Sequence, residues 1–347
     1  MGKPPVSIVV PVYNMGDSIE KCVQSLLVQD YENYEIILVD DGSKDDSFER
    51  CQKLQEGHSI IQVYHTENRG SGPARNYGIE HSKGRYIFFP DADDLLDSCA
   101  ISVMVEAMEC GKNDLVVFGY KEIRADGSFS REKKYPELHQ SGDDIRNNYA
   151  EYMGSSVSLG IQGAPWNKFF DLEIVRSNGI EYPPLRRHQD EGFIARYMCY
   201  AKNVHFIQDV LYTHYTNDLK LQWKKYPIDY IDAVIGLNET RKETILKWNP
   251  NDKETHKIIQ REFICNVIKA LELSFSPKMG FNKSQRLNWI KDKIQVSGIC
   301  YVTIPDNLGK YQKFVMGIIK DNNIKKLYRT LNFKVRIEMS PLYKFIR

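Results

Sequence analysis

The chain has 347 residues, of which 42% are hydrophobic and 27% are charged, and its formal net charge is +1. This composition is typical of globular proteins and excludes a fibrous or wholly disordered chain, and the chain is long enough for one large domain or two smaller ones. The body of the chain is not basic, which argues against an enzyme that acts on nucleic acid.

Short apolar runs alternate with helix-type patterns over the first 118 residues. The runs are residues 7–10, 35–39, 60–64, 85–89 and 115–118. Continuous apolar runs are typical of strands buried on both faces of a mostly parallel sheet. The intervening segments therefore predict helices on both sides, in an α/β fold of the doubly wound type.

Three helices are expected between these strands. The first follows from an apolar stripe at i, i+3, i+4, i+7 and i+8. Its members are Ile19, Cys22, Val23, Leu26 and Leu27. Asp17 is its expected N-cap, with Glu20 three residues later. The second helix is expected from Ser43, and the third over residues 73–81.

The pattern changes after residue 118. Residues 119–159 are polar and turn-rich, residues 160–215 regain apolar segments, and residues 226–300 follow helical patterns. We predict a first domain over residues 1–220 and a helical domain over residues 221–347. No apolar run approaches the ~18 residues that span a bilayer. Seven scattered cysteines without a C-x-x-C pair, and no evident secretory leader, predict reduced thiols in the cytoplasm.

The strongest chemical signal lies where the apolar run at residues 85–89 is followed by Asp91, Asp93 and Asp94. Carboxylates packed this closely repel one another unless a cation offsets their charge. Mg²⁺ or Mn²⁺ prefers such oxygen ligands and shares its coordination shell with substrate phosphates. The alternative is an acidic loop in which Asp94 or Asp97 caps the helix that follows.

Two further loops are expected at the same edge, because the carboxyl ends of parallel strands face one way. They are residues 11–14 and residues 40–43. A carboxylate in the second loop suits a nucleobase N–H or a ribose hydroxyl, and Gly42 permits a tight turn. The alternative for Asp-Gly-Ser is an ordinary turn and helix cap.

Four segments together resemble the successive signatures of family 2 glycosyltransferases. They are residues 6–14, 39–43, 68–76 and 91–94, in the family's order and approximate spacing. The resemblance covers about residues 5–215. It implies a GT-A fold, with a doubly wound, mostly parallel sheet and a C-terminal helical region. It also implies a bacterial enzyme of the capsular polysaccharide, exopolysaccharide or O-antigen type.

The resemblance further implies a donor site and a metal site. The donor-nucleotide residues would be Pro11, Tyr13, Asn14, Asp40, Asp41, Arg75, Asp91 and Ala92. Asp93 and Asp91 would hold Mg²⁺ or Mn²⁺, with His214 as a further candidate ligand. The alternatives are a surface salt bridge for Arg75 and a structural role for His214.

Two later segments resemble family stretches near the acceptor. Residues 164–170 match a Trp-Asn-Lys stretch, in which Trp166 offers a face for a sugar ring and Lys168 a charge for a phosphate. Alternatively, Trp166 belongs to the core. Residues 188–193 resemble a Glu-Asp-x-x-Phe segment, which aligns Asp190 with the catalytic base and places Gln189 where Glu is usual. Glu191 is the substitute base, and the alternative is an acidic helix N-terminus.

The expected activity is inverting transfer of a hexosyl or N-acetylhexosaminyl group from a nucleotide-diphosphate donor, expected to be a UDP-sugar. The acceptor is expected to be a hydroxyl of a lipid-linked oligosaccharide. One alternative is a nucleotidyltransferase, but residues 13–17 lack the expected cluster of Lys or Arg. The other is a non-catalytic protein that binds nucleotide sugars, which the Gln189 departure favours.

The end of the chain is basic, since residues 309–347 contain ten Lys or Arg and two Asp or Glu. Apolar residues alternate with these charges. They are Phe314, Val315, Ile318, Ile319, Leu327, Tyr328 and Leu331. The pattern predicts an interfacial helix on an anionic membrane, which would place the protein on the inner face of the cytoplasmic membrane. The alternative is that these residues pack on the helical domain.

Overall fold

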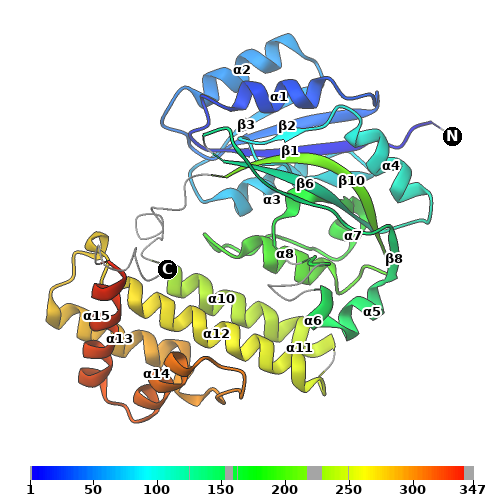
Figure 1. Ribbon diagram of the computed structural model, residues 1–347. Coiled ribbons are helices and arrows are strands. Elements are labelled where there is room, and N and C mark those ends of the chain that lie inside the picture. The colour runs from blue at the N-terminus through cyan, green and yellow to red at the C-terminus, as the bar shows by residue number, and fades with distance from the viewer. Residues whose placement is uncertain are drawn as a thin grey trace. The chain divides into compact units, whose positions relative to one another are not determined.

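The computed structural model describes residues 2–124, 126–152, 159–161, 163–216, 229–248 and 250–339 (Figure 1). The chain divides into two compact units. Unit 1 comprises Met1–Asp218 with Lys247–Asn249, and unit 2 comprises Leu219–Leu246 with Pro250–Arg347. The sequence pattern predicts the boundary between the two domains after residue 220.

Within the described residues, unit 1 is built on one ten-stranded sheet. Its strands are β1 (Val6–Val12), β2 (Tyr34–Asp40), β3 (Ile61–His65), β4 (Tyr86–Phe88), β5 (Leu95–Leu96), β6 (Leu115–Arg124), β7 (Phe129–Lys133), β8 (Leu138–Ser141), β9 (Lys168–Asp171) and β10 (Asn203–Thr216). The order is β3-β2-β1-β4-β9-β6-β10-β5, with β7 beside β6 and β8 beside β10.

The first half of the sheet is parallel, as the continuous apolar runs predict. β1 pairs in parallel with β2 and β4, and β2 pairs in parallel with β3. The carboxyl ends of β1, β2 and β4 therefore lie at one edge. In the second half, β9 is antiparallel to both β4 and β6, while β6 and β10 are parallel. This is the α/β architecture expected of a GT-A fold.

The helices of unit 1 cover the sheet from both sides. They are α1 (Ile19–Leu27), α2 (Ser47–Gly57), α3 (Ser71–His81), α4 (Ala100–Glu109), α5 (Gly142–Asn147), α6 (Tyr149–Tyr152), α7 (Leu172–Ser177) and α8 (Gln189–Tyr197). α1 and α2 lie on one side of β1–β3, and α3 lies on the other (Figure 1). Close packing of α3 on β1 requires Gly78, because a Cβ there would lie 2.2 Å from Val9 Cγ1.

Two predicted helix starts are wrong. The N-cap of α1 is Ser18 rather than Asp17, and its side chain makes no capping bond. α2 begins at Ser47 rather than Ser43. The reason for the second error is that the Ser43 hydroxyl accepts the backbone N–H of Asn14 at 3.0 Å, so residue 43 belongs to the loop between strand and helix.

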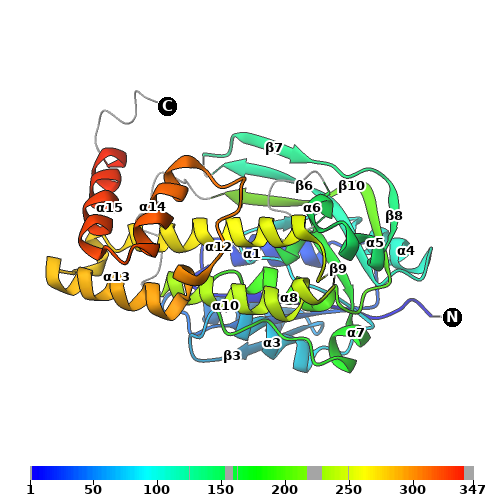
Figure 2. The same ribbon diagram turned by 90° about the horizontal axis from the view of Figure 1, so that it is seen from below.

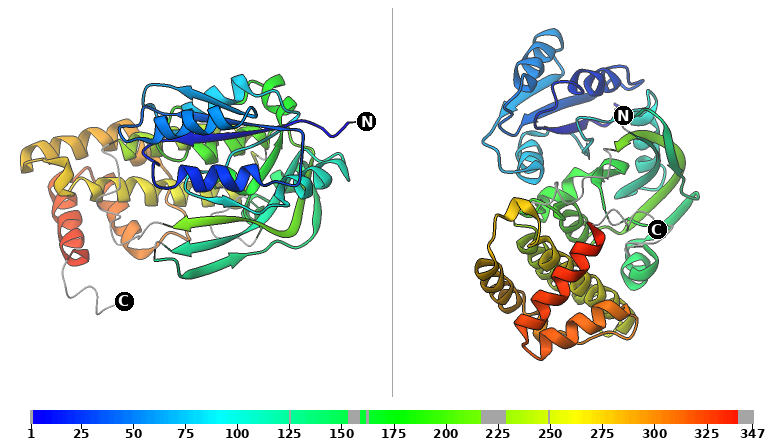
Figure 3. Two further views of the ribbon diagram at one scale, coloured as in Figure 1. Left: turned by 90° about the horizontal axis from the view of Figure 1, so that it is seen from above. Right: turned by 60° about the vertical axis from the view of Figure 1, so that its left-hand side comes forward.

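Unit 2 is helical. It contains α10 (Tyr230–Glu243), α12 (Lys253–Leu273), α13 (Lys283–Ser297), α14 (Lys310–Lys320) and α15 (Ile324–Glu338), while the short α11 (Ile245–Trp248) lies where the chain crosses between units. α10 and α12 lie side by side (Figure 2), and α15 packs beside α14 (Figure 3, right). None of the helices in the described part of the chain combines the length and hydropathy that a membrane span needs.

The apolar residues near the end of the chain mostly pack within unit 2. Val315, Ile318, Ile319, Leu327 and Leu331 are all buried in its core. Burial of each such side chain contributes about 1.5–3 kcal/mol. The wide apolar stripe predicted to enter a membrane is therefore not available to lipid, and the alternative of packing on the helical domain holds for these five residues.

Candidate active site

Asn14 ties the loop after β1 to the loop after β2. It has a positive φ of 53°, and its side-chain oxygen accepts the backbone N–H of Lys44 at 2.8 Å. The next residue, Met15, donates its backbone N–H to the hydroxyl of Ser47 at 2.7 Å. The two loops predicted to hold the nucleotide are thus held together by hydrogen bonds between backbone N–H groups and side-chain oxygens.

Asp40 lies at the end of β2 and is fully buried. Its Oδ2 accepts the backbone N–H of Ser43 at 3.2 Å and lies 2.7 Å from Nδ1 of His65. Among the described residues, nothing donates to its Oδ1. Asp40 therefore has one carboxylate oxygen that the protein leaves unsatisfied.

Asp41 instead closes the loop before α3. Its two carboxylate oxygens accept the backbone N–H groups of Arg69 and Gly70, each at 2.8 Å. Gly42 is needed beside it, because its φ is +69° and a Cβ there would lie 2.8 Å from the backbone nitrogen of Asn68. A nucleobase contact by Asp41 would have to compete with these two backbone bonds.

The other residues predicted around the nucleotide differ in exposure. Pro11 lies within β1, where it pairs with Val39. Tyr13 follows the strand and is 38% exposed, whereas Ala92 is buried. Of these three, Tyr13 is the one whose side chain is open to a ligand.

Asp94 anchors the acidic loop to the end of β10. It is 1% exposed. Its carboxylate accepts the hydroxyl of Tyr212 at 2.7 Å and the backbone N–H of Tyr215 at 2.8 Å, and it lies 3.0 Å from Nδ1 of His214. The Tyr212 oxygen in turn accepts the backbone N–H of Asp91 at 2.9 Å. The helix-capping alternative does not hold for Asp94, whereas the Asp97 carboxylate accepts the backbone N–H of Cys99, the N-cap residue of α4, at 3.4 Å.

Asp93 and Asp91 present the charge that a cation would offset. In the described part of the chain, no other residue donates a hydrogen bond to the half-buried carboxylate of Asp93, and its pKa is raised by burial and then by Asp94. Burial, with the charges of Asp94, Asp190 and Asp93, raises the pKa of Asp91 to about 7 against the opposing effect of Arg75. Such an oxygen-only set fits Mg²⁺ or Mn²⁺.

His214 is held as a partner of Asp94. Burial opposes its charged form, but the hydrogen bond and charge of Asp94 raise the pKa of His214 overall. Because Nδ1 of His214 faces Asp94, Nε2 is the ring nitrogen that remains for a ligand, and metal binding by His214 stays a prediction. Among the described residues, the one group of three acidic, His or Cys ligand atoms within 4.8 Å of one another lies elsewhere. Two carboxylates completed by phosphate oxygens and water would suffice for a cation here.

Arg75 joins three parts of the fold at one guanidinium group. It lies on α3 with 3% of its side chain exposed, so it is not a surface salt bridge. Its Nη2 donates to Asp91 Oδ1 at 2.6 Å, and its Nη1 donates to Asp190 Oδ1 at 3.0 Å. The acidic loop after β4 and the first turn of α8 are thereby held against the same side chain.

Three neighbouring residues in the first turn of α8 make different contacts. Gln189 accepts the backbone N–H of Gly72 at 3.1 Å and donates to the Ser71 hydroxyl, so its neutral amide caps the start of α3. Glu191 pairs with His188 at 2.8 Å. Asp190 alone of the three contacts Arg75. Its pKa is raised, because burial and the charge of Glu191 outweigh Arg75 and Lys168.

Trp166 and Lys168 are both buried in the core of unit 1. Trp166 is 8% exposed and stacks on Tyr212 and His214 at centroid distances of 5.0 and 4.8 Å. Lys168 is 1% exposed, and its ammonium donates to the backbone oxygen of Ala164 at 2.8 Å. Burial lowers the pKa of Lys168 to about 7. The core alternative fits Trp166, and Lys168 does not present its charge to solvent.

The comparisons with known proteins agree with this arrangement. Residues 7–159 match the family model described as Glycosyl transferase family 2. Over these residues the chain is similar to the glycosyltransferases of family 2. One similar protein is "Glycosyltransferase GlyG" of Streptococcus pneumoniae serotype 4. It is 28% identical over 309 residues, which cover 80% of this chain and 99% of that protein.

Two solved structures share the fold of this chain. The crystal structure of S. aureus TarS 1-349 in complex with UDP-GlcNAc has a TM-score of 0.64 at 17% identity, and the match covers 94% of this chain and 90% of that one. The mannosyltransferase PcManGT from Pyrobaculum calidifontis, in complex with GDP-Man and Mn²⁺, has a TM-score of 0.53 at 13% identity, covering 98% and 89%. The GT-A fold predicted from the sequence is confirmed.

The contact between Asp94 and Tyr212 is not predicted from the sequence. There, Asp94 belongs to the acidic run, and Tyr212 lies two residues before His214. A signal was present, because Tyr212 and His214 stand two apart in a strand and so share one face. The partner on that face, Asp94, lies more than one hundred residues away and cannot be assigned without the fold.

Replacing Arg75 with Ala is expected to destabilise the enzyme by roughly 2–4 kcal/mol, because two partly buried carboxylates lose their shared counter-ion. The loss should be larger at pH 8 than at pH 5. The folded-state pKa values of Asp91 and Asp190 are raised, so both groups gain protons, and repel less, as the pH falls. Urea unfolding at both pH values measures this effect. The surface variant Arg50→Ala is the control, and an equal loss in both variants contradicts the interpretation.

Proposed function

We propose that this glycosyltransferase moves a hexosyl or N-acetylhexosaminyl group from a UDP-sugar to an acceptor hydroxyl, with inversion at the anomeric carbon. One observation carries the proposal: Arg75 holds Asp190 and Asp91 on the same guanidinium, next to Asp93. A proton acceptor and the carboxylates of a diphosphate site therefore belong to one cluster. The UDP-GlcNAc bound by TarS, which shares the fold, supports UDP as the nucleotide.

Asp190 has the properties of the base. Because burial raises its pKa, the ionised carboxylate is a stronger proton acceptor than an exposed aspartate, and Arg75 beside it opposes part of this rise. It takes the proton of the acceptor hydroxyl as that oxygen forms its bond to the anomeric carbon. The bond from the anomeric carbon to the diphosphate oxygen breaks on the opposite face.

Asp93 and Asp91 are the residues that would hold Mg²⁺ or Mn²⁺. When bound there, a divalent cation would neutralise charge on the departing diphosphate. Asp94 orients the loop, since its contacts to Tyr212 and Tyr215 fix the backbone that carries both ligands. Arg75 pairs with both Asp91 and Asp190, and its positive charge offsets the repulsion between the metal ligand and the base.

A panel of nucleotide sugars incubated with Mn²⁺ tests this function. We expect slow release of nucleoside diphosphate from a UDP-sugar without acceptor, and faster release with acceptor. Release of pyrophosphate from a nucleoside triphosphate would instead indicate a nucleotidyltransferase. Saturable binding without any release would indicate a non-catalytic protein that binds nucleotide sugars.

We further propose a lipid-linked acceptor of the kind used in assembly of capsule, exopolysaccharide or O-antigen. The support is an exposed stripe along α15 and α14, narrower than the sequence predicts. Its members are Phe314, Lys326, Arg329, Phe333, Arg336 and Ile337. Positions 326, 329, 333 and 336 follow helical spacing on one face, and the Lys326 ammonium lies 5.7 Å from the centre of the Phe314 ring. Basic residues around exposed aromatic rings suit an anionic bilayer surface.

Reversing two charges of this stripe, Lys326→Glu with Arg329→Glu, is expected to weaken binding to phosphatidylglycerol vesicles by about 30-fold or more. The reason is that each basic residue contributes ~1 kcal/mol at an anionic surface. Co-sedimentation measures the effect. The control is Lys21→Glu with Lys53→Glu on unit 1, where both residues are also exposed. Equal binding by the two double variants would exclude this stripe as the contact. Substitution is preferable to truncation, because α14 and α15 contribute to the core.

A further inference from the structure

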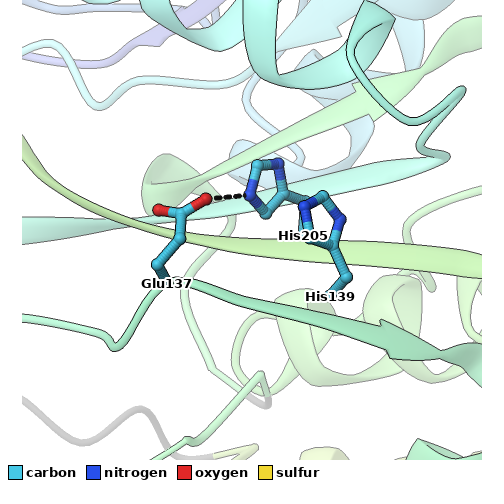
Figure 4. Close-up of side chains that lie close together, drawn as sticks. All are labelled: Glu137, His139 and His205. Atoms are coloured by element: carbon cyan, nitrogen blue, oxygen red, sulfur yellow. Dashed lines mark hydrogen bonds and ion pairs between the residues drawn. The ribbon is translucent and has the colours of Figure 1, made fainter.

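A second group of potential metal ligands lies on β8, on the residue before it and on β10, at the other end of β10 from His214. It consists of Glu137, His139 and His205 (Figure 4). His205 and His214 are nine residues apart along β10, so they are separated by roughly 25–30 Å at ~3.3 Å per residue. The group therefore belongs to neither the acidic loop nor the Arg75 cluster.

Strand pairing brings these three side chains together. His139 of β8 lies directly opposite His205 of β10 in the antiparallel ladder. Glu137 precedes His139 by two residues, which is the spacing that returns a side chain to the same face. The two imidazole rings stack with centroids 3.8 Å apart, and one ligand atom from each residue lies within 4.8 Å of the others.

The contacts of His205 suit a metal ligand. Its Nε2 faces the Glu137 carboxylate, so a nitrogen and an oxygen are directed to the same point. Its Nδ1 lies 3.4 Å from the backbone oxygen of Ala107, which can only accept. When Nε2 binds a metal ion, the ring proton lies on Nδ1, and this backbone oxygen is then its acceptor.

We propose that Glu137, His139 and His205 bind a Zn²⁺-class transition-metal ion. Two imidazole nitrogens and a carboxylate suit Zn²⁺, Cu²⁺ or Ni²⁺ better than Mg²⁺, and zinc sites with three protein ligands complete their shell with water. Tetrahedral ligands about 2.1 Å from zinc lie roughly 3.4 Å apart. Glu137 and His139 are both exposed, so rotations of their side chains suffice to reach such positions.

The bound ion clamps β8 to β10. β8 pairs with β10 over four residues and is followed directly by α5, so it is a short strand that a cross-link stabilises. Because the ion binds the folded pair and not the separated strands, added Zn²⁺ raises the melting temperature of the chain. The effect requires no nucleotide sugar.

Zinc titration of the full-length, tag-free chain tests the proposal. Calorimetry is run with Mg²⁺ in excess, so that the acidic loop is occupied, and melting curves are recorded in parallel. We expect one Zn²⁺ per chain and a rise in melting temperature. His139→Ala and Glu137→Gln should each weaken Zn²⁺ binding by more than roughly 100-fold. Losing only the hydrogen-bond partner of a metal ligand already weakens metal binding by roughly 10- to 100-fold, and these variants remove a ligand itself. The control is His58→Ala, because His58 is also exposed but is the C-cap residue of α2 and not part of this group.

The variants at exposed positions keep the test independent of folding, since only His205 is buried. Zinc binding that is lost in both exposed variants and kept in His58→Ala supports the site. Stoichiometric binding that survives Glu137→Gln and His139→Ala overturns it. The absence of micromolar Zn²⁺ binding in the unmodified chain also overturns it, and then His205 and Glu137 form only an ion pair.

Discussion

Replacing Asp93 with Ala is expected to lower kcat by roughly 10³-fold, and to do so without unfolding the protein. No other described residue donates a hydrogen bond to this carboxylate, so its removal breaks no contact that supports the loop. Metal stabilisation of a leaving phosphate is worth several kcal/mol, and each 1.36 kcal/mol corresponds to about tenfold in rate. A loss of about 4 kcal/mol therefore corresponds to three decades in kcat.

The measurement is steady-state transfer with saturating donor and Mn²⁺, together with urea unfolding of the same variant. Asp30→Ala is the matched control, because Asp30 is an exposed aspartate outside the acidic loop. We expect the control to keep full activity. An Asp93→Ala enzyme that turns over normally would remove the metal assignment, and one that loses stability would show that Asp93 supports the fold instead.

Asp190→Asn is expected to reduce kcat by roughly 10²- to 10⁴-fold while leaving donor KM almost unchanged. The amide retains the size of the side chain but cannot accept the acceptor's proton. Glu191→Gln is the matched control one residue away, since Glu191 pairs with His188 and not with Arg75. If Glu191→Gln loses activity and Asp190→Asn keeps it, the base is Glu191.

The pH dependence of kcat/KM gives a second readout for Asp190. A base must be deprotonated to act, so activity rises with pH as Asp190 loses its proton. Because burial raises the pKa of Asp190, this rise should occur above the usual aspartate value of about 3.9. The acid limb should disappear in Asp190→Asn, leaving a low and flat profile over the same range.

The parallel half of the sheet was predictable because its strands are buried on both faces. Continuous apolar runs, such as residues 35–39, strongly favour a central strand. The apolar residues of α1 follow helical spacing and so predict that helix. The loop that carries Asp91 and Asp93 then falls at the carboxyl edge by topology alone. The short β9 was not predicted, since a four-residue strand inserted antiparallel between β4 and β6 has no distinctive period.

The side-chain contacts of the site could not be predicted from the sequence, because they join residues that are far apart along the chain. Arg75 meets Asp190 across 115 positions, and Asp94 meets Tyr212 across 118. Residue type alone also misplaces Lys168, whose charge is buried against a backbone oxygen. The apolar residues of α14 and α15 show the same limit, because an amphipathic pattern does not distinguish a protein core from a lipid surface.

Crystals grown with UDP and Mn²⁺ test the metal and donor assignments together, since anomalous scattering locates the ion directly. We predict one Mn²⁺ held by Asp93 and Asp91 next to the diphosphate, with the uracil ring beside the loops after β1 and β2. Manganese and UDP bound away from the acidic loop, or no ordered binding at saturating concentrations, would contradict the proposed site.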